Sequence, residues 1–383
     1  MRQLNETTII GRGPAGLLAA SLIARRDEKC LIVSDNQGSL GLWSANFDFY
    51  SPQNTIRDPW GYIESFPIKI SRTQWSNLWS IFSSILKDAK VELNPIPEHN
   101  LWTITCTGKP KSVFMVPKWQ YVSSHLSEVI FIGFEGLADS MAALQCENYK
   151  NLTGSNSSYY QIPKPSQYSN SWGSLRWASY FDTDEAMKWL IPHLRKAVGG
   201  LDTTWPVLLP QVLGRRFVEK NLRLLRKVLR RPVFEYPLLS PSIGGLRVQD
   251  RWEWSLRQQG VGFLTGKVTG IAPGGLISLN DGRSWKTDRI ITATGGVLGG
   301  GVEIDPYGKA YDSTNPTKTG LVKIEKDIQI QWESSPLEDL VITAGAQCIN
   351  WNPNRDSNGG AMILATVAKG LGMTKGSRQN NEF

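Results

Sequence analysis

The stretch TTIIGRGPAGLLAASLIARR, residues 7–26, constrains the fold more than any other part of the chain. A short apolar run predicts a strand over 7–11, and the run after it predicts a helix over 15–26. The run CLIVSD, rich in apolar residues, predicts a second buried strand over 29–34. Strand, helix and strand of this length make a βαβ unit, which implies a parallel sheet.

The turn between the first strand and the helix has the spacing G-x-G-x-x-G at Gly11, Gly13 and Gly16. Glycines in this spacing allow a tight turn, a close approach of a pyrophosphate to the backbone, and close packing of helix on strand. The start of the helix leaves N–H groups for a phosphate from Ala15 onward, while Pro14, which has no N–H, sets the first helical turn. We therefore predict a dinucleotide on this turn, held by these five residues.

The end of the second strand usually carries an acidic residue that binds the ribose hydroxyls. Here Ser34 occupies that place and Asp35 follows it, so the carboxylate is absent or displaced by one residue. This weakens an NAD interpretation, although both residues stay candidates for cofactor contacts. Ser44 and Asn46 come next and are candidates for contacts near the pyrophosphate, or else polar residues that cap a loop.

Alternating strand and helix patterns continue along the chain, over 128–145 and 183–236, with polar turns between them. The pattern of the first unit returns near residue 246. We therefore predict an α/β fold with a discontinuous, Rossmann-like cofactor-binding domain, residues 1–110 plus 238–383. A smaller α/β domain, residues 111–237, is inserted in it.

Composition excludes several classes of function. The 383 residues carry a formal net charge of +8, which suits an acidic ligand or partner and does not by itself indicate nucleic acid. The sequence shows no C-x-x-C, no H-E-x-x-H and no G-x-S-x-G, so we expect no metal site and no zinc or serine hydrolase. No apolar run is long enough to span a bilayer, and we expect a cytoplasmic protein. The four cysteines are widely spaced: Cys30, Cys106, Cys146 and Cys348.

Two later segments, ITATGG (291–296) and ITAGA (342–346), resemble patterns of the two-dinucleotide-binding flavoproteins. In those proteins a strand ending in A-T-G passes near the cofactor, and a glycine-containing turn and a glycine-rich helix embrace the flavin. The resemblance implies FAD, with FMN as the alternative because Ser34 provides poorly for the adenosine. The implied contacts are Thr294, Gly295, Gly345, Ala346, Gly360 and Ala361.

A more specific resemblance runs over nearly the whole chain. The segments GRGPAGLLAASL, GSLGLWSANFDF, VIFIGFEGLAD, LRWASYFD and PLLSPSIGGLRVQDRWEWSLRQQGVGFLTG resemble the B-subunit family of anaerobic glycerol-3-phosphate dehydrogenase. The pattern Pro-Ser-x-x-Gly-x-Arg, residues 241–247, is the most distinctive. The family also lacks the acidic residue at the end of the second strand.

This resemblance implies a flavoprotein subunit of a dehydrogenase complex. A larger flavin subunit would oxidise glycerol 3-phosphate, and an iron–sulfur subunit would pass electrons to the quinone pool. Contact with the inner face of the cell membrane would then come through the partners alone. The candidate docking regions are the tryptophan-rich segment 43–82, the polar loop 151–174 and the basic helix 216–230, with the alternative that the first and third pack on the core.

Two rival interpretations stay open at this point. One is a self-sufficient flavin oxidoreductase acting on a small hydroxy compound, and the other is a structural subunit that keeps the fold without a cofactor. No catalytic base stands out in the sequence. Arg176 and Arg247 are candidates for binding a substrate anion, or equally for structural ion pairs.

Overall fold

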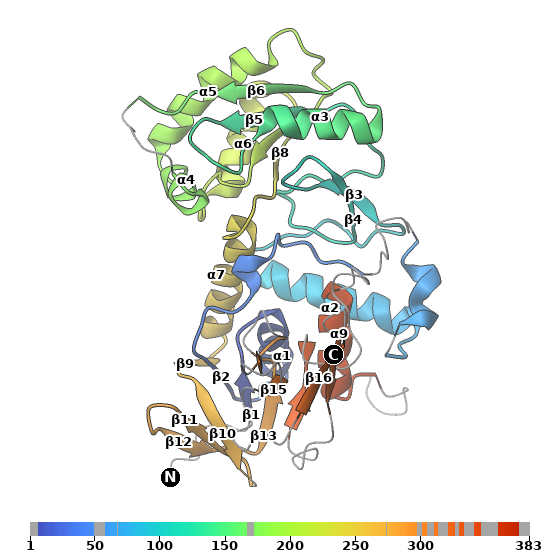
Figure 1. The fold of residues 1–383 in the computed structure, drawn as a ribbon, viewed down its shortest axis with the longest axis vertical. Helices are drawn as coiled ribbons and strands as arrows, with labels where there is room; N and C mark the ends of the chain where they lie inside the picture. The colour runs from blue at the N-terminus through green and yellow to red at the C-terminus, as the bar shows by residue number, and fades with distance from the viewer. Residues whose placement is uncertain are drawn as a thin grey trace.

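The computed structural model describes residues 7–49, 58–66, 68–166, 172–272, 274–296, 301–304, 310–312, 321–325, 329–332, 341–345 and 359–374. Two parallel sheets organise these residues, one in the lower half and one in the upper half of Figure 1. Helix α7 (Ile243–Gln258) leads from the upper sheet down to the lower one. The arrangement confirms the predicted α/β fold class.

The lower sheet has the strand order β18-β13-β1-β2-β9, and all of its pairs are parallel. Its strands come from both ends of the chain. Helices α1 (Pro14–Ala24) and α9 (Gly359–Gly370) pack against each other, and α1 also contacts α7. The strands are β1 (Thr7–Ile10), β2 (Cys30–Ser34), β9 (Gly262–Thr265), β13 (Arg289–Thr292) and β18 (Val341–Thr343).

The upper sheet has the order β6-β5-β7-β8, again with parallel pairs. Its strands and the helices between them come from residues 130–236. Gly133 lies inside a strand, and the next helix begins only at Ala142. The elements are β5 (Ile130–Phe134), α3 (Ala142–Thr153), β6 (Ser158–Ile162), α4 (Ser174–Tyr180), α5 (Asp184–Val198), β7 (Val207–Pro210), α6 (Val218–Leu229) and β8 (Val233–Tyr236).

A hairpin of β3 (Leu101–Ile104) and β4 (Pro110–Val113) connects the two halves. Single bridges continue it on both sides, from Phe47 to Met115 and from Gln120 to Glu235. The predicted domain boundary at residue 110 falls at the start of β4 and would split the hairpin. We therefore propose a junction after these bridges rather than at 110.

Smaller elements complete the description. A three-stranded antiparallel sheet follows β9, and within it β11 and β12 form a hairpin. The remaining elements are η1 (Leu40–Leu42), η3 (Trp60–Ser65), α2 (Arg72–Asp88), β10 (Val268–Ala272), β11 (Leu276–Leu279), β12 (Ser284–Lys286), β14 (Val302–Ile304), β15 (Ala310–Asp312), β16 (Leu321–Glu325) and β17 (Gln329–Trp332).

The tryptophan-rich segment forms core. Helix α2 begins with a capping box in which Ser71 accepts from the backbone N–H of Gln74. Trp75 and Trp79 of this helix are 0% exposed, and Phe49 packs against both rings with centroids 4.8 and 5.7 Å away. The prediction that this segment is an exposed docking surface is wrong for these tryptophans, because their burial leaves nothing for a partner to contact.

Cys30 is expected to resist alkylation in the folded protein. It lies in β2 with 2% of its surface exposed, and burial raises the pKa of its thiol to about 11. The thiolate is the reactive form, so both access and ionisation are lost. Iodoacetamide labelling at pH 7.5, mapped by mass spectrometry, should leave Cys30 unmodified until guanidinium is added. Modification of Cys30 in the native state at the rate seen after unfolding would contradict this placement.

Candidate functional site

The glycine-rich turn lies where β1 meets α1. Gly11 has φ +105°, and a Cβ there would lie 2.3 Å from the carbonyl oxygen of Ala293. A Cβ on Gly16 would lie 2.0 Å from the carbonyl oxygen of Gly11. Both glycines are therefore required by the packing of the chain itself.

Gly13 differs from these two glycines. Its backbone, with φ −73° and ψ −177°, suits any residue, and the nearest atom to an added Cβ is Ser39 Oγ at 3.4 Å. It is the N-cap of α1, with no side-chain cap, and Pro14 follows as the first helical residue. The packing of the chain therefore leaves room for a side chain at Gly13, and the N-cap position is the internal reason that favours glycine over alanine there.

The strands that the sequence linked to the flavin do converge on this turn. Gly11 packs against Ala293 and Thr294 at the end of β13, and Gly295 follows with φ +82°. Gly345, at the end of β18, lies against the first turn of α1, since a Cβ there would be 2.8 Å from the Cβ of Ala15. The sheet thus brings segments more than 300 residues apart to one edge, at the carboxyl ends of parallel strands.

The N-terminus of α9 packs against the segment after β2, at Asp48. A Cβ on Gly360 would lie 2.8 Å from the carbonyl oxygen of Asp48, and the N–H of Ala361 donates to that oxygen at 2.9 Å. The Ala361 N–H is therefore engaged within the chain. Asp48 is buried, which raises the pKa of its carboxyl against the opposing effect of Lys111, whose Nζ lies 2.8 Å from it. Ala346 lies outside the described residues.

The end of β2 uses its polar side chains to build a turn. The Ser34 hydroxyl donates to the carbonyl of Asn36 at 3.0 Å, and the Asn36 side chain accepts from the N–H of Gly38 at 2.8 Å. Asp35 is exposed and accepts from Asn36 Nδ2 at 3.0 Å. Ser34 is thus committed to the turn, and Asp35 is the better placed of the two to meet a ligand.

The turn after β2 also places Ser39 beside Gly13, a contact that the sequence pattern did not predict. Gly38, with φ +75°, packs against the carbonyl of Arg12, and Ser39 then lies beside Gly13. The Ser39 hydroxyl is a hydrogen-bonding group next to the point where a pyrophosphate would approach. The signal in the sequence is Asn36 two residues before Gly38, which is typical of an Asx turn.

Helix α7 supports the turn from the other side. Glu253 pairs with Arg12 at 3.2 Å, and Gln249 donates from its side chain to the carbonyl of Gln37. Both contacts come from one face of α7, because residues four apart lie above one another on a helix. The glycine turn and the loop after β2 are therefore held together by this helix.

Asn46 belongs to a buried chain of amides that runs toward the inserted domain. Gln120 donates to Asn46 Oδ1 at 2.5 Å, Gln211 donates to Gln120 at 3.4 Å, and Gly244 N–H donates to Gln211 at 3.1 Å. Ser44 is half-buried in the loop before Asn46. The network gives Asn46 a structural part, whatever cofactor contact it also makes.

The two arginine candidates lie in different surroundings, one buried and one exposed. Arg247 is 0% exposed and forms a bidentate pair with Glu235, at 2.5 and 3.0 Å, while its Nε donates to the Gly214 carbonyl at 2.7 Å. A substrate-binding role for Arg247 does not fit, because its guanidinium is enclosed and already paired. Arg176 is exposed on α4 and stacks over Trp172, 4.5 Å from the ring centroid.

The distinctive Pro-Ser-x-x-Gly-x-Arg pattern is a structural joint. Ser242 caps α7 by accepting from the N–H of Gly245 at 3.1 Å, and Arg247 reaches the inserted domain. Gly245 lies against η1, since a Cβ there would be 1.8 Å from the carbonyl of Leu40. The motif thus fastens η1 and the strand β8, which carries Glu235, to one helix.

Gly245→Ala is expected to lower the free energy of unfolding by about 1–3 kcal/mol, the usual cost of overpacking. Alanine in a helix is otherwise favoured over glycine by about 1 kcal/mol, so a loss means that the contact with Leu40 dominates. Denaturant titration measures it. Gly173→Ala is the control, because nothing lies within 4 Å of an added Cβ there. Equal stability of the two variants would contradict the close approach.

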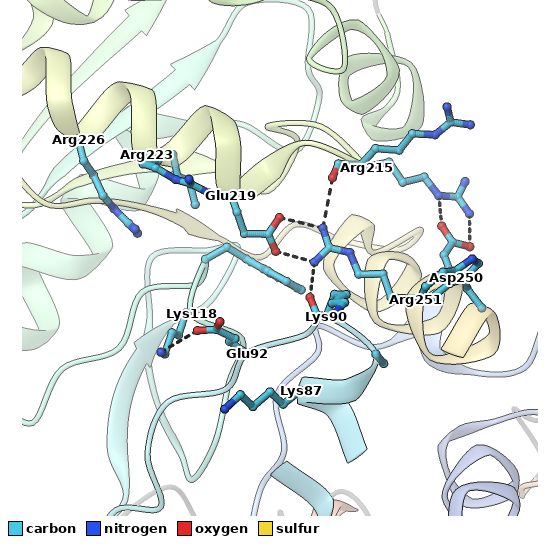
Figure 2. Close-up of a pocket in the computed structure, with 15 residues that line it drawn as sticks. Lys87, Lys90, Glu92, Lys118, Arg215, Glu219, Arg223, Arg226, Asp250 and Arg251 are labelled. Carbon is cyan, nitrogen blue, oxygen red and sulfur yellow. Dashed lines mark hydrogen bonds and ion pairs between the residues drawn. The ribbon is translucent and has the colours of Figure 1, made fainter. Parts of the chain in front are cut away.

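A cleft of about 1030 Å³ opens between the two halves, lined by α6, α7, the end of α2 and the segment around Lys118 (Figure 2). Eight of its lining side chains are cationic and three are acidic. The exposed basic face of α6 contributes to it, while Leu222, Leu225 and Leu229 of this helix are buried, which confirms that the leucine stripe packs on the core. The ion pairs in the cleft are Arg251–Glu219 at 2.5 Å, Arg215–Asp250 at 2.5 Å and Lys118–Glu92 at 2.9 Å.

Comparison with known sequences finds relatives named as the B subunit of anaerobic glycerol-3-phosphate dehydrogenase. The protein of Pectobacterium atrosepticum is 22% identical over 275 residues, which are 67% of this chain and 64% of that protein. The protein of Glaesserella parasuis is 21% identical over 340 residues, which are 78% of this chain and 77% of that protein. The resemblance inferred from the motifs is confirmed, and the match spans less than two thirds of the first relative. No family model matches the chain.

Solved structures give weaker likenesses. The 3-ketosteroid delta1-dehydrogenase of Sterolibacterium denitrificans has 12% identity and a TM-score of 0.35, over 76% of this chain and 48% of its own. A 2-methyl-3-hydroxypyridine-5-carboxylic acid oxygenase has 10% identity and a TM-score of 0.35, over 98% of this chain and 84% of its own. At such scores these likenesses carry no argument, and the fold rests on the sheet topology described above.

Within the described part of the chain, no helix combines the length and apolar character needed to cross a bilayer. The same residues hold no group of three or more His, Cys, Asp or Glu side chains arranged around a common point for a metal ion.

Proposed function

We propose that this chain is a flavoprotein subunit of a dehydrogenase assembly and that it binds FAD at the glycine turn. The observation that supports the cofactor most directly is Gly13, a glycine that the chain does not need for its own packing. The similarity to the B-subunit proteins of anaerobic glycerol-3-phosphate dehydrogenase supports the assembly.

The residues around the turn fit a dinucleotide. The N-terminus of α1 offers the N–H groups that follow Gly13, and Ser39 adds a hydroxyl beside them. Exposed Asp35 is available to the adenosine ribose if the cofactor is FAD, and it would have no part if the cofactor is FMN. Thr294, Gly295 and Gly345 line the other side of the turn, so the chain would hold the cofactor by backbone groups more than by charges.

A bound flavin would accept a hydride or electrons from a reduced substrate or partner and pass them on. The chain itself would bind and orient the flavin and exclude water from it. Arg12 is paired with Glu253 on α7, which fixes its side chain beside the glycine turn.

The finer assignment follows the relatives. We propose that the assembly oxidises glycerol 3-phosphate in a larger flavin subunit, that an iron–sulfur subunit carries electrons to the quinone pool, and that this chain reaches the inner face of the cell membrane only through these partners. The relatives' name, a subunit of glycerol-3-phosphate dehydrogenase, supports the substrate and the existence of partners.

The visible spectrum of the pure chain tests the cofactor. Absorbance maxima typical of oxidised flavin are expected, and the mass of the cofactor released by acid distinguishes FAD from FMN. A colourless protein that takes up neither flavin on reconstitution would favour a structural subunit without a cofactor.

The isolated chain is expected to turn over glycerol 3-phosphate with an artificial electron acceptor at no more than about one hundredth of the rate of the whole assembly, a loss of about 2.7 kcal/mol in transition-state stabilisation. The reason is that Arg247 is enclosed and Arg176 is stacked on a tryptophan, so neither provides a phosphate site. Steady-state assays of the chain and of the assembly make the comparison. Comparable rates would favour the self-sufficient oxidoreductase.

A further inference from the structure

The cleft between the two halves carries more positive charge than its own acids can neutralise. Arg251, Arg215 and Lys118 have carboxylate partners within the cleft. The side chains of four other cations have no hydrogen bond or ion pair among the described residues: Lys87, Lys90, Arg216 and Arg223. All four are exposed.

The unpaired cations come from separate elements and border one space. Lys87 and Lys90 lie at the end of α2, and Arg216 and Arg223 lie at the start of α6 and within it. In Figure 2, Arg223 lies on α6 in the upper part of the view, and Lys118 and Lys87 lie below it on the other side of the cleft. Such convergence raises the local potential, which favours an anionic occupant.

The lining distinguishes a macromolecular occupant from a small ligand. Small-molecule pockets are mostly apolar with a few placed polar groups and occupy roughly 300–1,000 Å³. This cleft lies at the top of that range, and eleven of its fifteen lining residues carry a charge, so it differs from such pockets in its charge. Its aromatic group at the rim is Trp254, 53% exposed, and tryptophan beside arginine is the usual composition of a protein-interface anchor.

The position of the cleft relates it to the cofactor turn. Asp250, Arg251 and Trp254 face the cleft from α7, while Gln249 and Glu253 of the same helix hold the loop after β2 and Arg12. An occupant of the cleft therefore contacts the helix that supports the glycine turn. An electron-transfer partner docked there would be separated from that turn by the diameter of one helix, ~10 Å.

We infer that this cleft is the docking site for an acidic segment of a partner polypeptide in the electron-transfer assembly. The inference rests on the proposed function, because it takes the occupant to be a subunit of that assembly. The charge of the unpaired lysines and arginines selects the acidic segment, and Trp254 anchors it at the rim.

Charge reversal tests the site. The triple variant Lys87→Glu, Arg216→Glu, Arg223→Glu is compared with the control Lys150→Glu, Lys188→Glu, Arg195→Glu, which makes the same change of net charge at exposed residues of α3 and α5. Binding of a fluorescein-labelled deca-glutamate peptide is measured by anisotropy at low salt. We expect the cleft variant to bind at least about tenfold more weakly than the control, and added salt to weaken binding to the wild type.

A photocrosslinker identifies the natural occupant. p-Benzoylphenylalanine in place of Trp254, in the full chain within its native cells, should cross-link to one partner subunit at an acidic segment, and the same group in place of exposed Leu152 on α3 should not. Equal peptide binding by the two charge variants, or cross-links to lipid alone, would overturn the inference. Tighter binding of inorganic pyrophosphate or of anionic phospholipid vesicles at the cleft than of the peptide would also overturn it.

The flavin spectrum separates this inference from the proposed function. If the wild-type protein contains no flavin, only the cofactor assignment is contradicted. Binding and cross-linking that depend on the cleft would still support the docking site. Flavin retained in both charge variants, with partner cross-links lost only in the cleft variant, is the expected result.

Discussion

Replacement of Gly13 by valine is expected to abolish flavin binding while the chain keeps its fold. The backbone at Gly13 has φ −73°, which valine adopts without strain, and an added Cβ meets Ser39 Oγ only at 3.4 Å. A pyrophosphate that lies against this backbone would instead meet the branched side chain. Flavin absorbance per mole of protein should fall to the background level, and far-ultraviolet circular dichroism should be unchanged.

The matched control is Gly16→Ala. Its methyl group would lie 2.0 Å from the carbonyl oxygen of Gly11, so this variant should lose stability and flavin together. Gly13→Ala should be intermediate, with weaker flavin binding and a cost to the α1 N-cap of at most about 1 kcal/mol. Full flavin occupancy in Gly13→Val would contradict the placement of the cofactor at this turn.

The difference between these glycines could not be predicted from the sequence. The spacing G-x-G-x-x-G identifies the turn, because the rule is local. Which glycine the chain needs depends on Ala293 and Ser39, and only the folded sheet places Ala293 beside Gly11. Local pattern thus predicts the βαβ unit and the parallel sheet, and long-range packing decides the part each residue plays.

The same distinction between local pattern and long-range packing applies to the leucines of α6 and to the charged residues. The leucine stripe of α6 follows from helical periodicity, and its burial was predictable. The cleft beside α6 was not predictable, because it forms only where the end of α2 and one side of α7 come close to α6 in the folded chain. Arg247 ends the Pro-Ser-x-x-Gly-x-Arg pattern, yet its carboxylate partner is twelve residues earlier on another element, and sequence alone does not separate an ion pair from a substrate site.

Removing one partner of the Arg247–Glu235 pair is expected to lower the free energy of unfolding by about 3–5 kcal/mol. Both side chains are 0% exposed, so the remaining charge would stay buried without its counter-ion. Arg247→Met also leaves the Gly214 carbonyl without its donor at 2.7 Å. Urea titration of the single variants and of Arg247→Met combined with Glu235→Leu measures the coupling, and the double variant should be more stable than either single one.

The two single variants should differ in their dependence on pH. Burial raises the pKa of Glu235 and Arg247 opposes this, so removing Arg247 raises the pKa further. A carboxyl whose pKa is higher in the folded state stabilises the fold while protonated, and that stability is lost as pH rises through the folded pKa. The stability deficit of Arg247→Met should therefore be smallest at low pH, where Glu235 is protonated, and should grow as pH rises. Glu235→Leu leaves a buried guanidinium that does not deprotonate, so its deficit should stay nearly constant over the same change of pH. Parallel pH profiles for the two variants would contradict a buried, charge-paired Glu235.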